Sequence, residues 1–364
     1  MARAFWDALP ADISLDVALH AECRLQHEPY PSRHHYVPVD WRGVENRGFE
    51  SGPGWLVGDT PVTEVEGRHY PLEFLARRLD HFHGLGLGVD AIGVGVDRLE
   101  SAEARELFRR HFLPIRTWTV RSTACQEALL DLGVSPQAIR VGADWAWLYR
   151  PRRDCREWAR AFWSGLGVDP ARPLLVANVV NLVWRKAAGA RRAVAAAFDE
   201  LAGQHGFQIA FFCSECRPGE LYDHAASNEI RGWMRRPAVI VPNQYWSPDQ
   251  MLGLLAHAAV TVSQRYHFTL ASVLAGTVPV TIVRSQKMET LLDDLGERPA
   301  GRIDSVTREQ LAGVVMDAVR RRREILEPLL TAKDRLRKRA GQNLLMLEWK
   351  KRAESLSEAE CRTK

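Results

Sequence analysis

The sequence predicts an α/β fold with two Rossmann-like domains, each built on a parallel sheet, followed by a helical C-terminal region. Three observations carry this prediction. The 364 residues exceed one ordinary core and, at roughly 150 residues per domain, fit about two. Short apolar runs alternate with amphipathic helical stretches, a pattern typical of parallel sheets covered by helices. The composition, 46% hydrophobic and 26% charged, is that of a globular chain.

The first domain is expected at 1–150. Its predicted strands are short runs rich in apolar residues, at 13–19, 54–58, 90–96, 117–122 and 138–144. Helices are expected at 71–84 and 100–112, where apolar residues recur at three- and four-residue spacing. A Pro-, Gly- and Arg-containing stretch at 149–173 then predicts a break between domains.

The second domain is expected at 165–305. Its predicted strands lie at 173–181, 206–213, 238–243, 259–264 and 278–283. Helices are expected between them at 191–204, 221–235, 248–258 and 268–275. Two such domains facing a cleft make the glycosyltransferase-B type of architecture. The segment 306–364 is helical and basic, and its charges indicate either a solvated helix face or contact with an anionic membrane surface that holds a lipid-linked acceptor.

Charge and residue usage exclude several classes of protein. A net charge of +4 without dense basic clusters argues against nucleic-acid binding and suits a small anionic ligand. Asp7, Asp12 and Asp16 exclude a signal peptide, and no apolar run is long enough to span a membrane. We therefore expect a cytoplasmic protein whose membrane contact is at most peripheral.

Cysteines and histidines do not have the spacing of a metal site. Cys213 and Cys216 form a C-x-x-C without a second pair, so we interpret them as incidental reduced thiols. The pair His81 and His83 has no third ligand nearby and is interpreted as structural or solvated. We expect no metal and no bound cofactor.

The stretch "VSQRYHFTLASVLAGTVPV" at 262–280 places charges where a strand ends and a helix begins. Ligands of parallel sheets bind beyond the carboxyl ends of the strands, and a helix start attracts phosphate or carboxylate. Ser263, Arg265 and His267 are therefore candidate site residues, with Arg265 as an anion binder and His267 as a charge partner or proton donor. The alternative is that Arg265 pairs with a structural carboxylate and His267 caps the helix.

This S-x-R-x-H motif, followed by "AGTVPV", a lysine and "DLG", resembles the polysaccharide pyruvyl transferase family. Other segments resemble it in the same order: "WLVGDTP", "AIGVGVDRL", "TWTVRSTACQEALLDLGV", "IRVGADWAWL" and "SPDQMLGLLAHAAVTVSQRYH". The similarity covers most of 56–296 and is strongest at 247–296.

The resemblance implies transfer of pyruvate from phosphoenolpyruvate, the donor substrate, to hydroxyls of a glycan or sugar-like acceptor that can be lipid-linked, giving a ketal or an enolpyruvyl-type product. It implies that Arg265 grips the donor and that His267 binds it or acts as acid and base. Lys287 matches a family lysine, with Arg284 beside it. The family has an arginine at the end of the second domain's first strand, where this chain has Asn178 and Asn181, so Arg185 or Lys186 is expected to substitute.

Two other functions stay open on the sequence. A nucleotide-sugar-dependent glycosyltransferase has the same architecture, and a non-catalytic relative would only bind an anion. Tryptophans at Trp145, Trp184 and Trp246 suit sugar stacking, although buried core tryptophans are the alternative interpretation.

The N-terminus departs from the family pattern of a strand and a glycine-rich turn. Residues 1–9 read as a helix, because Ala2, Phe5, Ala8 and Leu9 share one face before Pro10, and 13–19 reads as the first strand. We therefore expect the N-terminal sheet to lack its usual central strand and an upstream extension to improve solubility and activity.

Overall fold

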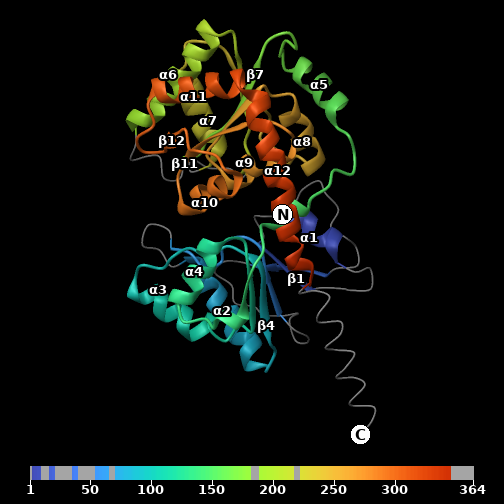
Figure 1. The fold of residues 1–364 in the computed structure, drawn as a ribbon, viewed down its shortest axis with the longest axis vertical. Helices are drawn as coiled ribbons and strands as arrows, with labels where there is room; N and C mark the ends of the chain where they lie inside the picture. Colours follow the sequence, from blue (N-terminus) through green and yellow to red (C-terminus); the bar gives the residue numbers. More distant parts are fainter. Residues whose placement is uncertain are drawn as a thin grey trace. The chain divides into compact units, whose positions relative to one another are not determined.

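The computed structural model describes residues 2–9, 16–20, 35–39, 54–64, 70–181, 188–216 and 222–345 (Figure 1). The chain forms two compact units. Unit 1 comprises Met1–Tyr149 and Arg335–Lys364, and unit 2 comprises Arg150–Asp334. Both are α/β units with parallel sheets.

Unit 2 has a six-stranded sheet in which every neighbouring pair is parallel. Its strands, in chain order, are β7 (Leu174–Asn178), β8 (Gln208–Phe211), β9 (Ala238–Ile240), β10 (Val260–Ser263), β11 (Pro279–Val283) and β12 (Gly301–Arg302). The spatial order is β12-β11-β10-β7-β8-β9. The chain therefore winds outward in both directions from the pair β7 and β10, which is the doubly wound Rossmann arrangement.

Such a sheet has its switch point between the first and fourth strands, and ligands bind beyond the carboxyl ends there. In unit 2 these strands are β7 and β10, and their last residues, Asn178 and Ser263, are paired in register. All residues of β7 and β10 are buried, as expected for strands covered on both faces.

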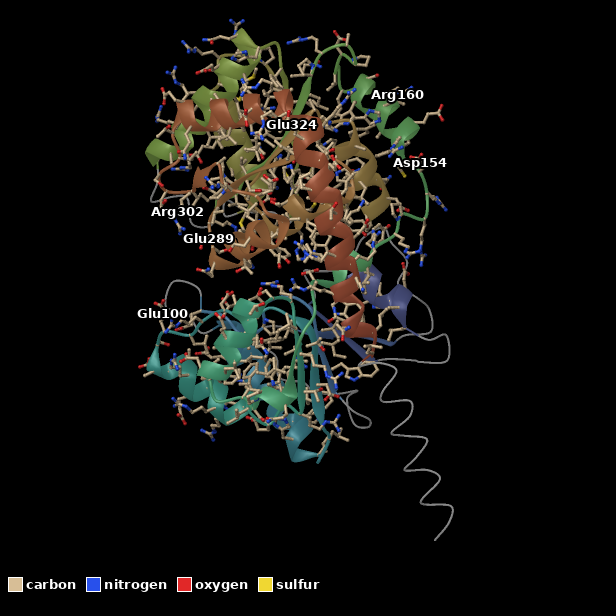
Figure 2. The ribbon with its side chains drawn as sticks, in the orientation of Figure 1. Glu100, Asp154, Arg160, Glu289, Arg302 and Glu324 are labelled. Carbon is tan, nitrogen blue, oxygen red and sulfur yellow. The ribbon has the colours of Figure 1, made fainter. Side chains whose placement is uncertain are left out.

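Helices of unit 2 form two packed groups. One consists of α6 (Ala188–Gln204), α7 (Asp223–Trp233) and α11 (Arg308–Arg320), and the other of α8 (Pro248–Ala256), α9 (Tyr266–Leu274) and α10 (Gln286–Leu295). Leu201, Phe198 and Val315 bury the first group against the sheet. At the surface, Arg302 of β12 forms an ion pair with Glu289 of α10 (Figure 2).

The sequence does not predict α5 (Arg156–Gly165), which lies inside the expected break at 149–173. This expectation was wrong because Pro151 and the arginines before the helix hide its periodicity. Within α5, Ala159 and Trp163 are buried, and the Trp163 indole donates to the Leu254 carbonyl of α8 at 3.2 Å.

Unit 1 has a four-stranded parallel sheet in the order β3-β4-β5-β6. Its strands are β3 (Gly54–Val57), β4 (Val89–Val94), β5 (Thr117–Val120) and β6 (Ile139–Val141). A separate parallel pair consists of β1 (Asp16–His20) and β2 (His35–Val39). Strand β1 overlaps the predicted strand 13–19, and it belongs to this two-stranded pair rather than to the four-stranded sheet.

The helices of unit 1 are α1 (Ala2–Ala8), α2 (Tyr70–Gly84), α3 (Ala102–Leu107) and α4 (Thr123–Asp131). Helix α1 confirms the predicted N-terminal helix, and Phe5 packs edge-on against Trp145 at 5.3 Å between ring centroids. Helix α3 continues into a π-helical turn at Phe108–Phe112, whose two phenylalanines are buried in the core with Trp118.

The last helix, α12 (Arg322–Ala340), begins in unit 2 and ends in unit 1. Two of its basic residues form hydrogen bonds to backbone carbonyls. Arg337 donates to the carbonyls of Trp147 and Tyr149, and Arg339 donates to the carbonyl of Gly142. These arginines satisfy carbonyls of a loop in unit 1, so the predicted solvated or membrane-facing role does not describe them.

Candidate functional site

The turn from β10 into α9 is fixed by Ser263. Its buried hydroxyl accepts a hydrogen bond from the Arg265 amide at 3.1 Å and donates to the Arg265 carbonyl at 2.9 Å. The α-helix α9 then begins at Tyr266, with Arg265 as its N-cap residue. Ser263 therefore uses its hydroxyl to position the backbone of Arg265.

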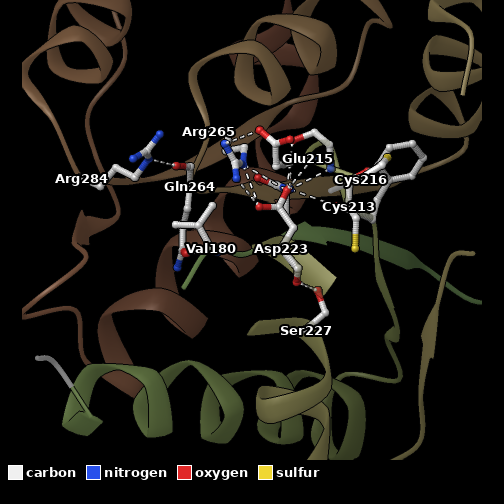
Figure 3. A network of polar contacts seen from close by, with 12 residues as sticks. Val180, Cys213, Glu215, Cys216, Asp223, Ser227, Gln264, Arg265 and Arg284 are labelled. Carbon is white, nitrogen blue, oxygen red and sulfur yellow. Dashed lines mark hydrogen bonds and ion pairs between the residues drawn. The ribbon is translucent and has the colours of Figure 1, made fainter. Parts of the chain in front are cut away.

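The side chain of Arg265 meets a buried carboxylate, Asp223 (Figure 3). Its Nε lies 2.8 Å from Oδ1 and 3.0 Å from Oδ2 of Asp223, and its Nη2 lies 2.5 Å from Oδ1. The other terminal nitrogen, Nη1, is 4.0 Å from the Glu215 carboxylate. The arginine side chain keeps 21% of its surface exposed, whereas Asp223 has none.

Asp223 is held by groups from three elements. As the first residue of α7, it lies where unpaired amides favour a carboxylate. Its Oδ2 accepts hydrogen bonds from the amides of Ser214 and Glu215, at 3.0 and 3.1 Å, in the loop after β8. The Asn178 amide at the end of β7 donates to the same oxygen at 2.9 Å. These contacts fix the carboxylate and, through it, the guanidinium of Arg265.

Arg284 provides a second cation at the end of the neighbouring strand β11. Its Nε donates to the Gln264 carbonyl at 2.9 Å. Burial, together with the positive charge of Arg265, lowers the pKa of Arg284 to about 10, although Asp223 acts in the opposite direction. Among the residues that the structure describes, no carboxylate forms an ion pair with Arg284. Its charge is therefore only weakly compensated.

Two buried polar groups beside these arginines have no hydrogen-bond partner among the described residues. Gln264, with no exposed surface, accepts from the Val180 amide at 2.9 Å, but its Nε2 is unsatisfied. Ser285, the N-cap residue of α10, has an unsatisfied buried hydroxyl. Together with Arg284 and the start of a ten-residue helix, these donors suit an anion such as phosphate or carboxylate.

Comparison with known proteins decides the family. A model of the polysaccharide pyruvyl transferase family matches residues 68–286, more than half of the chain. The chain belongs to this family. A search of curated protein sequences finds no match to it.

The fold is of the glycosyltransferase-B type, as the sequence predicts. WaaG, a glycosyltransferase involved in lipopolysaccharide biosynthesis, matches with a TM-score of 0.52 at 12% identity, covering 92% of this chain and 99% of WaaG. Anabaena Alr3699/HepE, in complex with UDP and glucose, matches with a TM-score of 0.51 at 12% identity, covering 79% and 76% of the two chains. A putative UDP-N-acetylglucosamine 2-epimerase from Listeria monocytogenes has a TM-score of 0.50 at 8% identity, covering 77% and 69%.

The other residues that the pyruvyl transferase motifs indicate have varied positions. His267 is exposed in the first turn of α9, with its ring edge-on to Tyr266 at 5.2 Å between centroids. Lys287 is half-buried in the first turn of α10, and Asn181 is buried three residues beyond β7. Arg185 and Lys186 lie outside the described residues.

The C-x-x-C motif borders the site, because Cys213 and Cys216 flank the two amides that bind Asp223. Burial, and then the charge of Asp223, raises the pKa of Cys213 to about 12 and that of Cys216 to about 11. Both thiols are therefore poor nucleophiles at neutral pH. Within the described parts of the chain, no group of three or more His, Cys, Asp or Glu side chains has a metal-binding arrangement.

Sequence reasoning missed Asp223, Glu215 and Gln264. Asp223 carried a usable signal, since it lies in the first turn of the predicted helix 221–235, where acidic residues are favoured. Gln264 lies between two predicted site residues and was passed over because it is uncharged.

As for the membrane, no described helix combines the length and apolar character that a span requires.

Proposed function

We propose that this transferase moves pyruvate from phosphoenolpyruvate to hydroxyls of a saccharide, and that the donor binds beyond the carboxyl ends of β10 and β11. The observation that carries the proposal is the weakly compensated charge of Arg284, whose side chain forms no ion pair with a described carboxylate and lies near the guanidinium of Arg265. An anion at this position would relieve the repulsion between two adjacent guanidinium groups. The enzyme class follows from the family, and the donor is the proposed part.

Phosphoenolpyruvate carries a phosphate and a carboxylate on one three-carbon unit, so it needs two adjacent groups of cationic donors. Arg284 has both terminal nitrogens available for an anion, and Arg265 has Nη1, which makes no hydrogen bond to a described residue. Gln264 Nε2, the Ser285 hydroxyl and the first amides of α10 supply neutral donors. The planar guanidinium of Arg284 can bind either anion through its two terminal nitrogens, and Arg265 can add Nη1.

The reaction requires an acid and an electrophilic carbon. Protonation of the donor's methylene carbon makes C2 electrophilic, and one saccharide hydroxyl adds to C2 and loses its proton. Cleavage of the C2–O bond to phosphate then releases inorganic phosphate and makes C2 electrophilic again. Addition of a second hydroxyl completes a ketal and gives up a proton. We assign the proton donor role to His267, which is exposed at the start of α9, two residues from Arg265.

The direct test is release of inorganic phosphate from phosphoenolpyruvate in the presence of a panel of hydroxylated saccharides. We expect acceptor-dependent release that is lost in Arg284→Gln and in His267→Gln. UDP-glucose is the comparison donor, because the structure of Alr3699/HepE contains it. Turnover of UDP-glucose without turnover of phosphoenolpyruvate would overturn the proposal.

A matched control separates site effects from general loss of charge. Arg298, between α10 and β12, is exposed and forms no ion pair with a described residue, so Arg298→Gln removes one positive charge from unit 2 outside the candidate donor site. Arg298→Gln should retain donor binding and phosphate release. Donor-induced thermal stabilisation of the protein provides a binding measurement that does not depend on the acceptor.

A further inference from the structure

Three aromatic rings form a cluster at the surface of unit 2. Trp158 and Phe162 lie one turn apart on α5 and stack at 5.4 Å between centroids. Trp246, from the loop between β9 and α8, meets Phe162 edge-on at 5.1 Å and Trp158 at 5.9 Å. All three side chains are half-buried and each keeps exposed surface.

The sequence indicates three tryptophans as candidates for sugar stacking. The structure describes two of them, one in a core and one at the surface. Trp145 is fully buried in the core of unit 1 and donates its indole hydrogen to the Ile92 carbonyl at 2.9 Å. Trp184 lies outside the described residues. Trp246 remains as the surface tryptophan, with two further rings beside it.

The loop that carries Trp246 is held rigidly. The Trp246 indole donates to the Pro242 carbonyl at 3.2 Å, which fixes the ring against its own loop. Ser247 and Gln250 close the end of the loop with a capping box at the start of α8. An aromatic side chain held in this way loses little conformational entropy when a ligand binds.

The same loop contacts the candidate donor site. Cys216 donates its thiol hydrogen to the Gln244 carbonyl at 3.0 Å, and Asn243 donates to the Cys216 carbonyl at 3.4 Å. Cys216 follows Glu215, whose amide binds Asp223, the partner of Arg265. Both loops lie beyond the carboxyl ends of neighbouring strands, β8 and β9, so the aromatic cluster borders the donor site within unit 2.

We propose that Trp158, Phe162 and Trp246 form a saccharide-binding subsite that holds one sugar ring of the acceptor beside the donor. A pyranose ring gathers C–H bonds on its faces and hydroxyls around its edge, which suits flat aromatic faces with polar groups beside them. Gln244, which is exposed, lies in the same loop as Trp246, and its side-chain carboxamide can bind hydroxyls. This inference rests on the proposed function for the identity of the acceptor as a saccharide.

A lipid surface fits the cluster less well. Trp158 and Phe162 lie on one flank of α5, whereas Arg156 and Arg160 lie on the opposite flank, about 160° away around the helix axis. The outward face between these flanks carries Glu157 and Ser164, which are exposed, and Figure 2 labels Arg160 on the helix and Asp154 just before its start. Glu157 and Ser164 make this face polar, whereas insertion of a helix into a lipid surface requires an apolar face.

The test is saturation-transfer NMR with the full chain and three defined probes: maltohexaose, cellohexaose and chitohexaose, without phosphoenolpyruvate. We expect transfer from aromatic protons to ring C–H groups of at least one probe, and a binding constant weakened roughly tenfold or more in Trp246→Ala. Trp246→Tyr should retain most of the binding, because it keeps a ring at that position. Trp233→Ala is the matched control, since Trp233 is also half-buried in unit 2 but packs under Arg191 and Arg192.

Binding of every probe equally by wild type and Trp246→Ala would overturn the proposal, as would absence of transfer to any of the three. Self-association that Trp246→Ala abolishes, measured by sedimentation, would assign the cluster to a second copy of the chain and also overturn it. Because no donor is present, the result is independent of donor binding. The thermal stabilisation of Trp246→Ala by phosphoenolpyruvate is measured separately. If it equals that of wild type, the proposed donor is supported even when the saccharide subsite is disproved.

Discussion

Asp223 and Arg265 meet side-on, with Nε between both carboxylate oxygens and Nη2 at 2.5 Å from Oδ1. The two residues are 42 positions apart, at the start of α7 and at the N-cap of α9. Asp223 is completely buried, so its charge depends on Arg265 and on the amides that point at it. Removal of either partner leaves the other charge poorly compensated.

Asp223→Asn should therefore destabilise unit 2 by roughly 3 kcal/mol, as loss of one partner of a buried ion pair does. It should also weaken phosphoenolpyruvate binding, because Arg265 is no longer positioned. Urea unfolding measures the first effect and thermal shift the second. The control is Asp131→Asn, which breaks the half-exposed pair with Arg105 and should cost less than about 1 kcal/mol. Equal losses for both variants would contradict a special role of the Asp223 contact.

We expect Arg284 to lower the folding stability of the protein and to increase its affinity for phosphoenolpyruvate. Its pKa is lowered to about 10, so the folded state disfavours the charged form relative to the unfolded chain. That cost in folding free energy is present at pH values below about 10 and is relieved as the pH rises from about 10 toward the ordinary pKa of an arginine. Arg284→Met should leave the melting temperature unchanged or raise it, and should weaken phosphoenolpyruvate binding roughly tenfold or more.

The pH dependence provides a second measurement for Arg284. Donor binding stabilises the protonated guanidinium, so affinity should be constant at lower pH and fall as pH approaches and passes about 10. Calorimetric titration with phosphoenolpyruvate between about pH 8 and pH 10.5 measures this decline, and Arg284→Met should show a flatter profile. Identical profiles for the two proteins would exclude Arg284 as the group that titrates.

The strands and the location of Arg265 were predictable because both depend on local sequence. A buried parallel strand is a short apolar run, and β10 ends at Ser263 where that run stops. The partner of Arg265 was not predictable, since strand order decides which distant carboxylate reaches it. The order places β10 beside β7 and β7 beside β8, and this brings the loop after β8 and the start of α7 to Arg265. Helix α5 was missed for a local reason, because arginines and Pro151 precede it.

The thiols of Cys213 and Cys216 should react slowly in the folded protein. With pKa values raised to about 12 and about 11, chiefly by burial, at most about one Cys216 in a thousand is a thiolate at pH 8. Iodoacetamide labelling followed by peptide mass spectrometry should be at least roughly a hundredfold slower than in urea. Both pKa values are higher in the folded protein than in the unfolded chain, so the folded state binds these protons more tightly. The resulting contribution to the free energy of unfolding is complete below about pH 9 and is lost as the pH rises through 11 to 12. Labelling at the rate of an unfolded thiol would contradict the burial argument.

Gly93 in β4 should tolerate no side chain. Its φ of +65° is left-handed, and a Cβ there would lie 2.5 Å from the Trp145 indole nitrogen. The indole cannot move away cheaply, because it is fully buried and donates to the Ile92 carbonyl. Gly93→Ala should therefore cost roughly 2 to 5 kcal/mol from backbone strain and overpacking together.

The control for this change is Gly313→Ala in α11, where a Cβ meets nothing within 4 Å. Alanine favours the helix and restricts the unfolded chain, so this variant should gain roughly 0.5 to 1 kcal/mol. Urea unfolding of both variants, followed by tryptophan fluorescence, measures the two effects with opposite expected signs. A Gly93→Ala protein as stable as wild type would show that the Trp145 side chain can move at little cost. The contact of Phe5 in α1 with that ring would then not be rigid.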